Sequence, residues 1–369
     1  MLLLLSNCDN WTTLYGTTTS TNMQSVPPLL LLLLVNTTAG FLAPRPLGKY
    51  NVTLTTGSLI DYTRNDRYAA SPTPRALMLS VFQPANCEST VPVLDMPDKV
   101  AEYQGPSLQE TFNISANFTT LFLEARLSVC PDHPHSCSSR HDFPILLFSP
   151  GYSIPRLYYN VLASAIASEG FTVITVDHPE DANIIVYPDG HAVYNNASIL
   201  DSSTWDYYPR AGEASFVIDQ LNNATAMASL LPHSGPRPFP TDRIAMLGHS
   251  AGGASAIPVL FLTHDNTTAP DWLEAWSQLE GPKLIVRIAN TTHETFSDVP
   301  TLLEAAGQST ADFADLLGTI APAEMVRILT TYTAAWMHGA FAGKEGGPLL
   351  EGHEPGRFPE VSVLMKGNF

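Results

Sequence analysis

The segment Arg243–Ser255, with the sequence RIAMLGHSAGGAS, constrains the fold more than any other part of the chain. Its first half, Ile244–Leu247, is short and apolar, as a buried strand would be. Gly248, Ser250 and Gly252 then fit the pattern G-x-S-x-G, and more small residues follow. A strand that turns at once into a helix needs glycine on both sides of the turning residue, because the two backbones approach closely. We therefore expect Ser250 to lie on a strained turn with its hydroxyl exposed at the carboxyl end of a strand.

Apolar runs and helical patterns alternate on both sides of this segment. Strands are expected at 76–82, 144–148, 171–176 and 283–288, and helices at 158–168, 211–231 and 325–341. This succession predicts an α/β fold with a mostly parallel sheet and helices on both faces. No repeat interrupts it, so residues 41–369 are expected to form a single domain.

The charge balance excludes some classes of partner. The chain has 369 residues, 44% of them hydrophobic, and a net charge of −17. A large core is therefore available, whereas nucleic acid and anionic lipid headgroups would both need a basic surface. Neutral and zwitterionic substrates remain compatible.

Residues 1–40 resemble a leader rather than part of a fold. The apolar run Leu29–Val35 is too short to span a bilayer and suits the central region of a signal peptide. No basic residue precedes Phe41, so we expect Met23 to be the true start and residues 1–22 to be a spurious extension. The mature protein is then expected to be secreted.

Beyond the leader, seven N-x-S/T sequons agree with a secretory route and predict a glycoprotein: Asn51, Asn113, Asn117, Asn196, Asn223, Asn266 and Asn290. Beyond the leader the chain has three cysteines. We expect Cys130 and Cys137 to close a small loop, which leaves Cys87 unpaired. Metal binding by these two cysteines with His133 and His135 is the weaker interpretation, because a secreted chain favours disulfides.

A serine hydroxyl attacks only when a nearby base takes its proton, and an imidazole is matched to neutral pH. In this type of sheet the base follows the last strand, so it comes after the serine in sequence. His293 fits, because it lies in the loop that leaves the strand at 283–288. His264 also follows an apolar run and is the competing candidate. His249 and His178 are expected to have packing roles.

The negative oxygen formed by such an attack needs two backbone donors. One is expected from the N–H of Ala251, directly after the nucleophile, and the other from a loop after an earlier strand. Gly151-Tyr152 follows the strand at 144–148, so Tyr152 is expected to supply the second N–H.

These motifs together resemble the platelet-activating factor acetylhydrolase family, in its fungal secreted branch. The resemblance runs from about residue 75 to the end and is carried by PILLFSPGYS, GFTVITVDHPEDA, LGHSAGGAS and THETFSDVP. It implies an α/β-hydrolase fold, no metal or other cofactor, and hydrolysis of short sn-2 acyl esters of phospholipids. By motif, Ser250 takes the place of the nucleophile and His293 that of the base. Pro150 stands where the family usually has His.

The chain departs from this family at the catalytic acid. The family carries its Asp in a segment like N-L-D-G on the strand after the nucleophile helix, and none is present. Leu247 is followed too closely by the next apolar run, 258–263, for an ordinary strand-to-strand crossover. One strand–helix segment is therefore expected to be missing at the junction 257/258, through a gene-model or splicing error.

Three outcomes remain open for the acid. Asp265 follows the apolar run at a strand end, where many α/β-hydrolases place theirs, and is the favoured substitute. Asp271 or Asp298 could approach instead. Without any acid, turnover would fall by about 10⁴-fold.

The sequence thus predicts a secreted serine esterase that acts on carboxylic esters, with ester or phospholipid substrates. The alternative is a catalytically impaired α/β-hydrolase-fold glycoprotein that serves as a binding scaffold. The apolar stripe of Met325–Phe341 is expected to cover the sheet, and association of this helix with a lipid surface is the second interpretation.

Overall fold

The computed structural model describes residues 40–66, 69, 71–131, 143–196, 208–231, 238–239, 241–255, 260–264, 276–277, 282–344 and 346–368. The predicted leader, the junction 257/258, Asp265 and Asp271 lie outside these residues. The chain from Gly40 to Phe369 packs as one unit. No helix in the described part is both long and apolar enough to cross a membrane.

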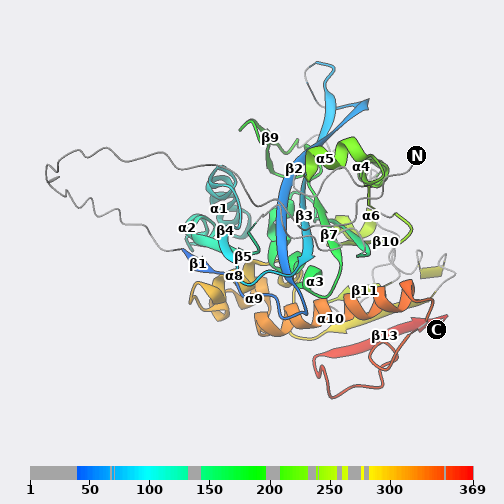
Figure 1. The fold of residues 1–369 in the computed structure, drawn as a ribbon. Coiled ribbons are helices and arrows are strands. Elements are labelled where there is room, and N and C mark those ends of the chain that lie inside the picture. The colour runs from blue at the N-terminus through cyan, green and yellow to red at the C-terminus, as the bar shows by residue number, and fades with distance from the viewer. Residues whose placement is uncertain are drawn as a thin grey trace, which may run out of the picture. The chain divides into compact units, whose positions relative to one another are not determined.

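A five-stranded sheet lies at the centre of this unit (Figure 1). Its strand order is β10 (Ile244–Gly248), β6 (Ile145–Ser149), β7 (Thr172–Val176), β3 (Pro74–Ala85) and β2 (Asn51–Asn65). The first three strands are parallel, and the β2–β3 hairpin joins β7 in antiparallel orientation. Every residue of β6 and β7 is buried. This explains why both strands are continuous apolar runs rather than alternating ones.

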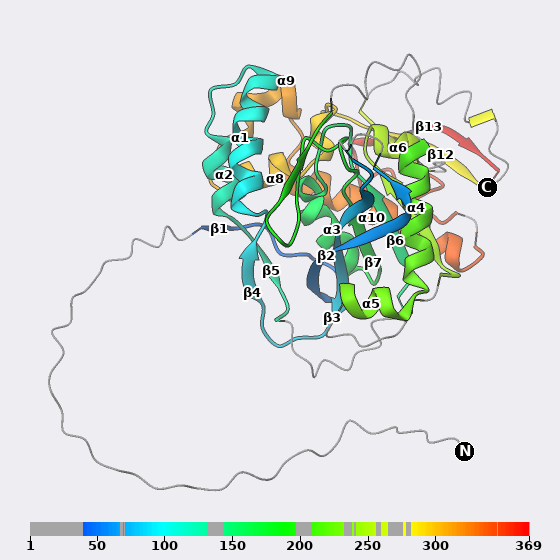
Figure 2. The ribbon, with the colours of Figure 1, turned by 90° about the horizontal axis from the view of Figure 1, so that it is seen from above.

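Helices cover both faces of the sheet, as predicted. Leu146 and Phe148 of β6 pack into one hydrophobic cluster, and Ile145 and Leu147 pack into the other, because successive side chains point to opposite faces. The first cluster includes residues of α3 (Asn160–Ser168), α8 (Val299–Ala305) and α10 (Pro322–Phe341). The second includes residues of α4 (Tyr208–Leu221) and α5 (Ala224–Leu230). Figure 2 shows α4 and α5 together on one side of β6 and β7.

A second sheet contains β11 (Leu260–Thr263), β12 (Lys283–Ile288) and β13 (Val361–Gly367). β11 and β12 are parallel, and β13 pairs with β12 in antiparallel orientation. Among the described residues β10 does not pair with β11, so the two sheets are separated after the strand that carries the serine turn. β10 has the apolar sequence of a central strand but is only half-buried. The separation falls where the sequence predicts a missing strand.

A smaller sheet and two helices flank the β2–β3 hairpin. The sheet order is β1 (Phe41–Leu42), β5 (Ala125–Val129) and β4 (Val91–Leu94), and the helices are α1 (Asp98–Phe112) and α2 (Phe118–Glu124). The remaining short elements are β8 (Ile184–Val186), β9 (Ala192–Tyr194), η1 (Arg156–Tyr159), α6 (Ala251–Ser255), η3 (Glu294–Phe296), η4 (Thr310–Phe313) and α9 (Ala314–Leu317).

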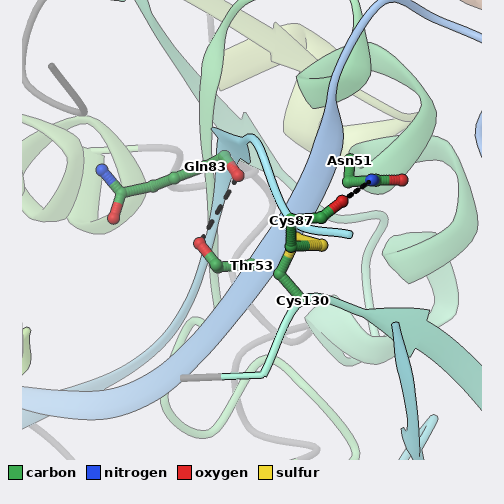
Figure 3. The surroundings of a disulfide bond; sticks show 5 residues. All are labelled: Asn51, Thr53, Gln83, Cys87 and Cys130. Carbon is green, nitrogen blue, oxygen red and sulfur yellow. Dashed lines mark hydrogen bonds between the residues drawn. A yellow bond between two sulfur atoms is a disulfide. The ribbon is translucent and has the colours of Figure 1, made fainter. Parts of the chain in front are cut away.

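The predicted Cys130–Cys137 pair is wrong. Cys87, which follows β3, is bonded to Cys130, which follows β5 (Figure 3). The N–H of Cys130 donates to the carbonyl of Val52 on β2. This bond places Cys130 at the end of the hairpin where Cys87 lies. The disulfide therefore ties the smaller sheet to the edge of the central sheet, at the β2–β3 side and away from β10.

Candidate active site

Ser250 lies on the strained turn that the sequence predicts. Its φ is +53°, in the left-handed region that non-glycine residues seldom adopt. A Cβ atom at Gly248 would lie 2.2 Å from the backbone of Gly252, and one at Gly252 would lie 1.9 Å from the carbonyl oxygen of Ser149. Neither position can accept a side chain. These contacts give the physical reason for glycine on both sides of the exposed Ser250.

Parallel pairing brings the predicted oxyanion loop beside this turn. Gly248 of β10 is opposite Ser149 of β6, so both strands deliver their next residues to the same edge of the sheet. The N–H of His249 donates to the carbonyl of Ser149 at 3.2 Å, which fixes the two loops against each other. Tyr152 lies three residues after Ser149, in the loop that follows β6. Ala251 begins α6, where an N–H group has no acceptor within the helix.

The two candidate bases lie close together, each after a strand of the second sheet. His264 directly follows β11, and His293 lies in the loop after β12. Their ring centroids are 6.2 Å apart in an edge-on arrangement. Desolvation by its surroundings lowers the pKa of His293 below its usual 6.5, so the imidazole is neutral at pH 7 and able to accept a proton. Among the described residues no hydrogen bond joins Ser250 Oγ to this imidazole, a bond that in many active sites tightens only with substrate.

His249 has a more specific position than the packing role expected for it. Its Nε2 donates to the backbone carbonyl of His293 at 3.1 Å, which leaves Nδ1 to accept the hydroxyl of Tyr159 at 2.8 Å. The Tyr159 oxygen in turn accepts the N–H of Gly151 at 3.2 Å. His249 thus connects the serine turn, the oxyanion loop and the loop of His293.

The imidazole of His249 is held in its neutral form. Burial and the nearby His293 ring lower the pKa of His249 to about 3. A neutral ring with one donor and one acceptor matches the two bonds that it makes. The sequence signal for this residue was its place inside the G-x-S-x-G pattern, but its partners are distant in the chain.

Asp298, one of the candidate acids, has a structural position. Its carboxylate is buried and accepts the backbone N–H groups of Val161 at 2.6 Å and Leu162 at 3.1 Å, at the start of α3. These N–H groups belong to the first turn of α3, where the helix supplies no acceptor for them. Burial and the nearby Asp95 raise the pKa of Asp298. Asp298 therefore anchors the segment that follows His293, while Asp265 and Asp271 lie outside the described residues.

The loop of the exposed serine, the oxyanion loop and the loop that carries the neutral imidazole of His293 are linked through His249 and Tyr159. Such a site can support nucleophilic attack on a carbonyl carbon. In the described part of the chain no three His, Cys, Asp or Glu side chains are grouped as metal ligands would be.

A strand–serine–helix turn in a sheet covered by helices on both faces defines an α/β-hydrolase. The family model described as platelet-activating factor acetylhydrolase, isoform II, matches residues 69–219. This range includes the oxyanion loop and ends before Ser250. A relative from Arthroderma benhamiae, named as a probable 1-alkyl-2-acetylglycerophosphocholine esterase, is 28% identical over 88% of this chain and 94% of its own length. These matches confirm the resemblance to the platelet-activating factor acetylhydrolase family.

A solved structure supports the fold. A ferulic acid esterase from Streptomyces cinnamoneus superposes with a TM-score of 0.69 and 23% identity, covering 89% of this chain and 100% of the other. At this identity the match concerns the fold alone.

Proposed function

We propose that this chain is a secreted serine esterase that hydrolyses carboxylic esters, with Ser250 as nucleophile and His293 as base. The observation that carries the proposal is Ser250 itself, whose strained backbone between two glycines presents the hydroxyl at the edge of the sheet. A non-glycine residue in this conformation costs of order 1–3 kcal/mol and persists only where the surroundings impose it.

In the proposed reaction Ser250 Oγ forms a bond to the ester carbonyl carbon while its proton passes to His293. The N–H groups of Tyr152 and Ala251 stabilise the negative oxygen. The C–O bond to the alcohol then breaks, and His293 returns the proton to the leaving oxygen. Water repeats the sequence on the acyl-enzyme and releases the acid. Asp265 is proposed to hold His293 in the required tautomer.

Phospholipids with a short sn-2 acyl chain are the proposed substrates. The name of the Arthroderma benhamiae relative supports this class, since it describes an esterase for a 2-acetyl phospholipid. A zwitterionic phosphocholine headgroup is also compatible with a net charge of −17.

Secretion and glycosylation are supported by two features. The Cys87–Cys130 disulfide suits an oxidising compartment. The sequon asparagines Asn51, Asn113, Asn117, Asn223 and Asn290 are exposed. N-terminal sequencing of the exported protein should give a mature start near residue 40, and a start before Met23 would contradict the predicted signal peptide.

Fluorophosphonate labelling tests the nucleophile directly. The wild-type protein should be labelled at Ser250 and should release acetate from a 2-acetyl phosphatidylcholine faster than it releases long acyl chains from a diacyl one. Ser250→Ala should lose labelling and at least about 10⁴-fold in kcat. Folded wild-type protein that neither labels nor hydrolyses any ester would overturn the proposal.

That negative result is what the second candidate function predicts. The separation of β10 from β11 favours it, because the family's acid strand is expected at this place. In that case the chain keeps the fold as a binding scaffold without turnover. The Asp265→Asn variant distinguishes a substituted acid from a lost one, since only the former predicts a large fall in kcat relative to an active wild type.

A further inference from the structure

Arg210, at the start of α4, donates hydrogen bonds to backbone carbonyl groups of the oxyanion loop. Its Nη1 lies 2.6 Å from the carbonyl oxygen of Pro150, and its Nη2 lies 3.3 Å from that of Gly151. The side chain is buried, with 4% of the residue exposed. One guanidinium therefore binds two consecutive carbonyl groups of the loop.

These two bonds contribute to the direction in which the N–H groups of the loop point. In a trans peptide the carbonyl and the next residue's N–H lie on opposite sides of the bond, and no described peptide bond is cis. With the Pro150 carbonyl held by Arg210, the N–H of Gly151 is directed away from it and donates to Tyr159 Oη. The Gly151 carbonyl accepts both Arg210 Nη2 and the N–H of Ile154, the latter at 3.4 Å, so the N–H of Tyr152 is also directed away from Arg210.

The guanidinium is itself fixed by Asp181. Nε and Nη2 of Arg210 donate to the two carboxylate oxygens of Asp181 at 2.8 and 2.6 Å. The same carboxylate accepts the N–H of Ser153 at 3.3 Å, and Ser153 has a φ of +61°. The Arg210–Asp181 pair thus holds the turn at both ends. A lysine could not do this, because its ammonium lacks the planar set of five donors.

A buried chain of polar groups supports Arg210 from the other side. Arg210 Nη1 donates to Ser149 Oγ at 3.2 Å, Ser149 Oγ lies 2.8 Å from His178 Nε2, and His178 Nδ1 lies 2.5 Å from Glu213. Glu213 is three residues after Arg210 on α4, so both side chains lie on one face of the helix. Although burial opposes its charge, bonds from His178 and Arg75 lower the pKa of Glu213, so it is ionised.

Ser149, His178 and Glu213 have the order of a catalytic triad, but only 1% of Ser149 is exposed. It lies beneath the loop, where no substrate carbonyl can reach it. The same burial, and the full set of protein acceptors around Arg210, exclude a role for this arginine in binding a phosphate headgroup. The arrangement supports the loop instead.

We propose that Arg210 is a positioning residue for the oxyanion hole: its hold on the Pro150 and Gly151 carbonyls aims the Tyr152 N–H at the negative oxygen of the reaction. This inference rests on the function proposed above. According to this inference, α4 helps to stabilise the tetrahedral intermediate through Arg210, which orients the oxyanion loop and does not contact the substrate.

The test compares Arg210→Lys with the wild type on a neutral p-nitrophenyl ester. Loss of an oxyanion donor costs about 10²–10³-fold in kcat, so we expect a loss of about 100-fold with KM changed by less than about threefold. Affinity for a trifluoromethyl ketone, which forms a charged adduct with the serine, should fall by a similar factor. Unchanged kcat or unchanged ketone affinity would overturn the proposal.

Arg75→Lys is the matched control. Arg75 is a buried arginine of the same cluster that pairs with Glu213 and Glu180 and donates to the carbonyl of Pro179. It should lose stability like Arg210→Lys but keep kcat within about threefold, because the bidentate bonds of Asp181 still hold the Arg210 guanidinium. An equal loss of kcat in both variants would show that the cluster is only structural, and would also overturn the proposal.

A second variant keeps the test decisive if Arg210→Lys does not fold. Asp181→Asn preserves the size of the side chain and removes the charge that orients Arg210. We expect parallel losses in kcat and ketone affinity, and unchanged values would contradict the inference. A wild-type protein without any esterase activity would instead reject the proposed function, whereas failure of the inference alone leaves the wild type fully active.

Discussion

His249 shows how one side chain can unite parts of the proposed site that are distant in the chain. It bonds to Tyr159, 90 positions away, and to the carbonyl of His293, 44 positions away. Its ring also lies 4.7 Å, centroid to centroid, from the ring of His293. Local sequence indicates only a histidine before the nucleophile. Its bridging role depends on tertiary contacts that no spacing rule contains.

Replacing His249 by Phe should therefore reduce activity. The new ring fills similar space but removes one donor and one acceptor, so the loops of Gly151 and His293 lose a common anchor. We expect kcat/KM to fall by about 10- to 100-fold and stability by roughly 1–3 kcal/mol, because buried groups of the site lose their partners. His191→Phe is the control, since His191 is exposed and its ring bonds to Asp189 and stacks on Tyr187. Equal activity in the two variants would contradict this role for His249.

The pH profile of activity distinguishes two effects on the pKa of His293: that of burial and that of a neighbouring carboxylate. Desolvation lowers the pKa of His293, and a carboxylate beside it would raise the pKa again. Only the neutral imidazole accepts the proton of Ser250, so kcat/KM rises with pH through the pKa of His293 in the free enzyme. In Asp265→Asn, where burial acts without this carboxylate, the midpoint should fall below 6.5 and below that of the wild type.

The comparison needs kcat/KM between about pH 4 and 9 with a neutral ester, so that substrate ionisation does not contribute. Identical midpoints in wild type and Asp265→Asn would contradict Asp265 as the acid. The same measurement on Asp271→Asn tests the alternative acid, and a lower midpoint in that variant alone would assign the role to Asp271.

At the scale of elements, the bounds of strands were easier to predict than the bounds of helices or the pairing of cysteines. The runs at 144–148 and 171–176 correspond to β6 and β7 within one residue at each boundary, because buried parallel strands have a continuous apolar signal. Helix boundaries were less accurate: the single helix expected at 211–231 is two helices, α4 and α5, and Asn223 caps the start of the second. The cysteine pairing failed because it depends on how β5 is placed beside the β2–β3 hairpin, which sequence separation does not report.

The separation between β10 and β11 makes a measurable prediction. β6 has a paired strand on each side, whereas β10 pairs only with β6 in the described residues. Amides on the outer side of β10 have no ladder partner there and should exchange with solvent faster. Hydrogen exchange should show less protection, by on the order of tenfold, in 244–248 than in 145–149.

β11 and β12 offer an internal control in the same experiment. β12 lies between two strands, and β11 pairs only with β12 among the described residues, so β11 should also exchange faster than β12. Equal protection of β10 and β6 would contradict an exposed edge and would mean that another segment of the chain covers it.

At the scale of the whole molecule, the Cys87–Cys130 disulfide and the proposed site lie at opposite edges of the central sheet. The sheet order runs from β10, which carries Ser250's turn, to the β2–β3 hairpin, whose end carries Cys87. Asn51 on β2 reinforces the disulfide by donating to the carbonyl of Cys87 at 2.9 Å (Figure 3). Stability and catalysis should therefore respond separately to its removal.

Replacing Cys87 and Cys130 together by Ser should lower the free energy of unfolding without changing kcat at low temperature. The bond closes a loop with a sequence separation of 43, which corresponds to about 4 kcal/mol of chain entropy in the unfolded state. A loss of this size should lower Tm by roughly 5 °C in a chain of this length. Cys137→Ser is the matched control, and its Tm should stay near that of the wild type. A fall in Tm for Cys137→Ser as large as that of the double variant would instead favour the Cys130–Cys137 pairing, and a parallel loss of kcat in the double variant would contradict the separation of the disulfide from the site.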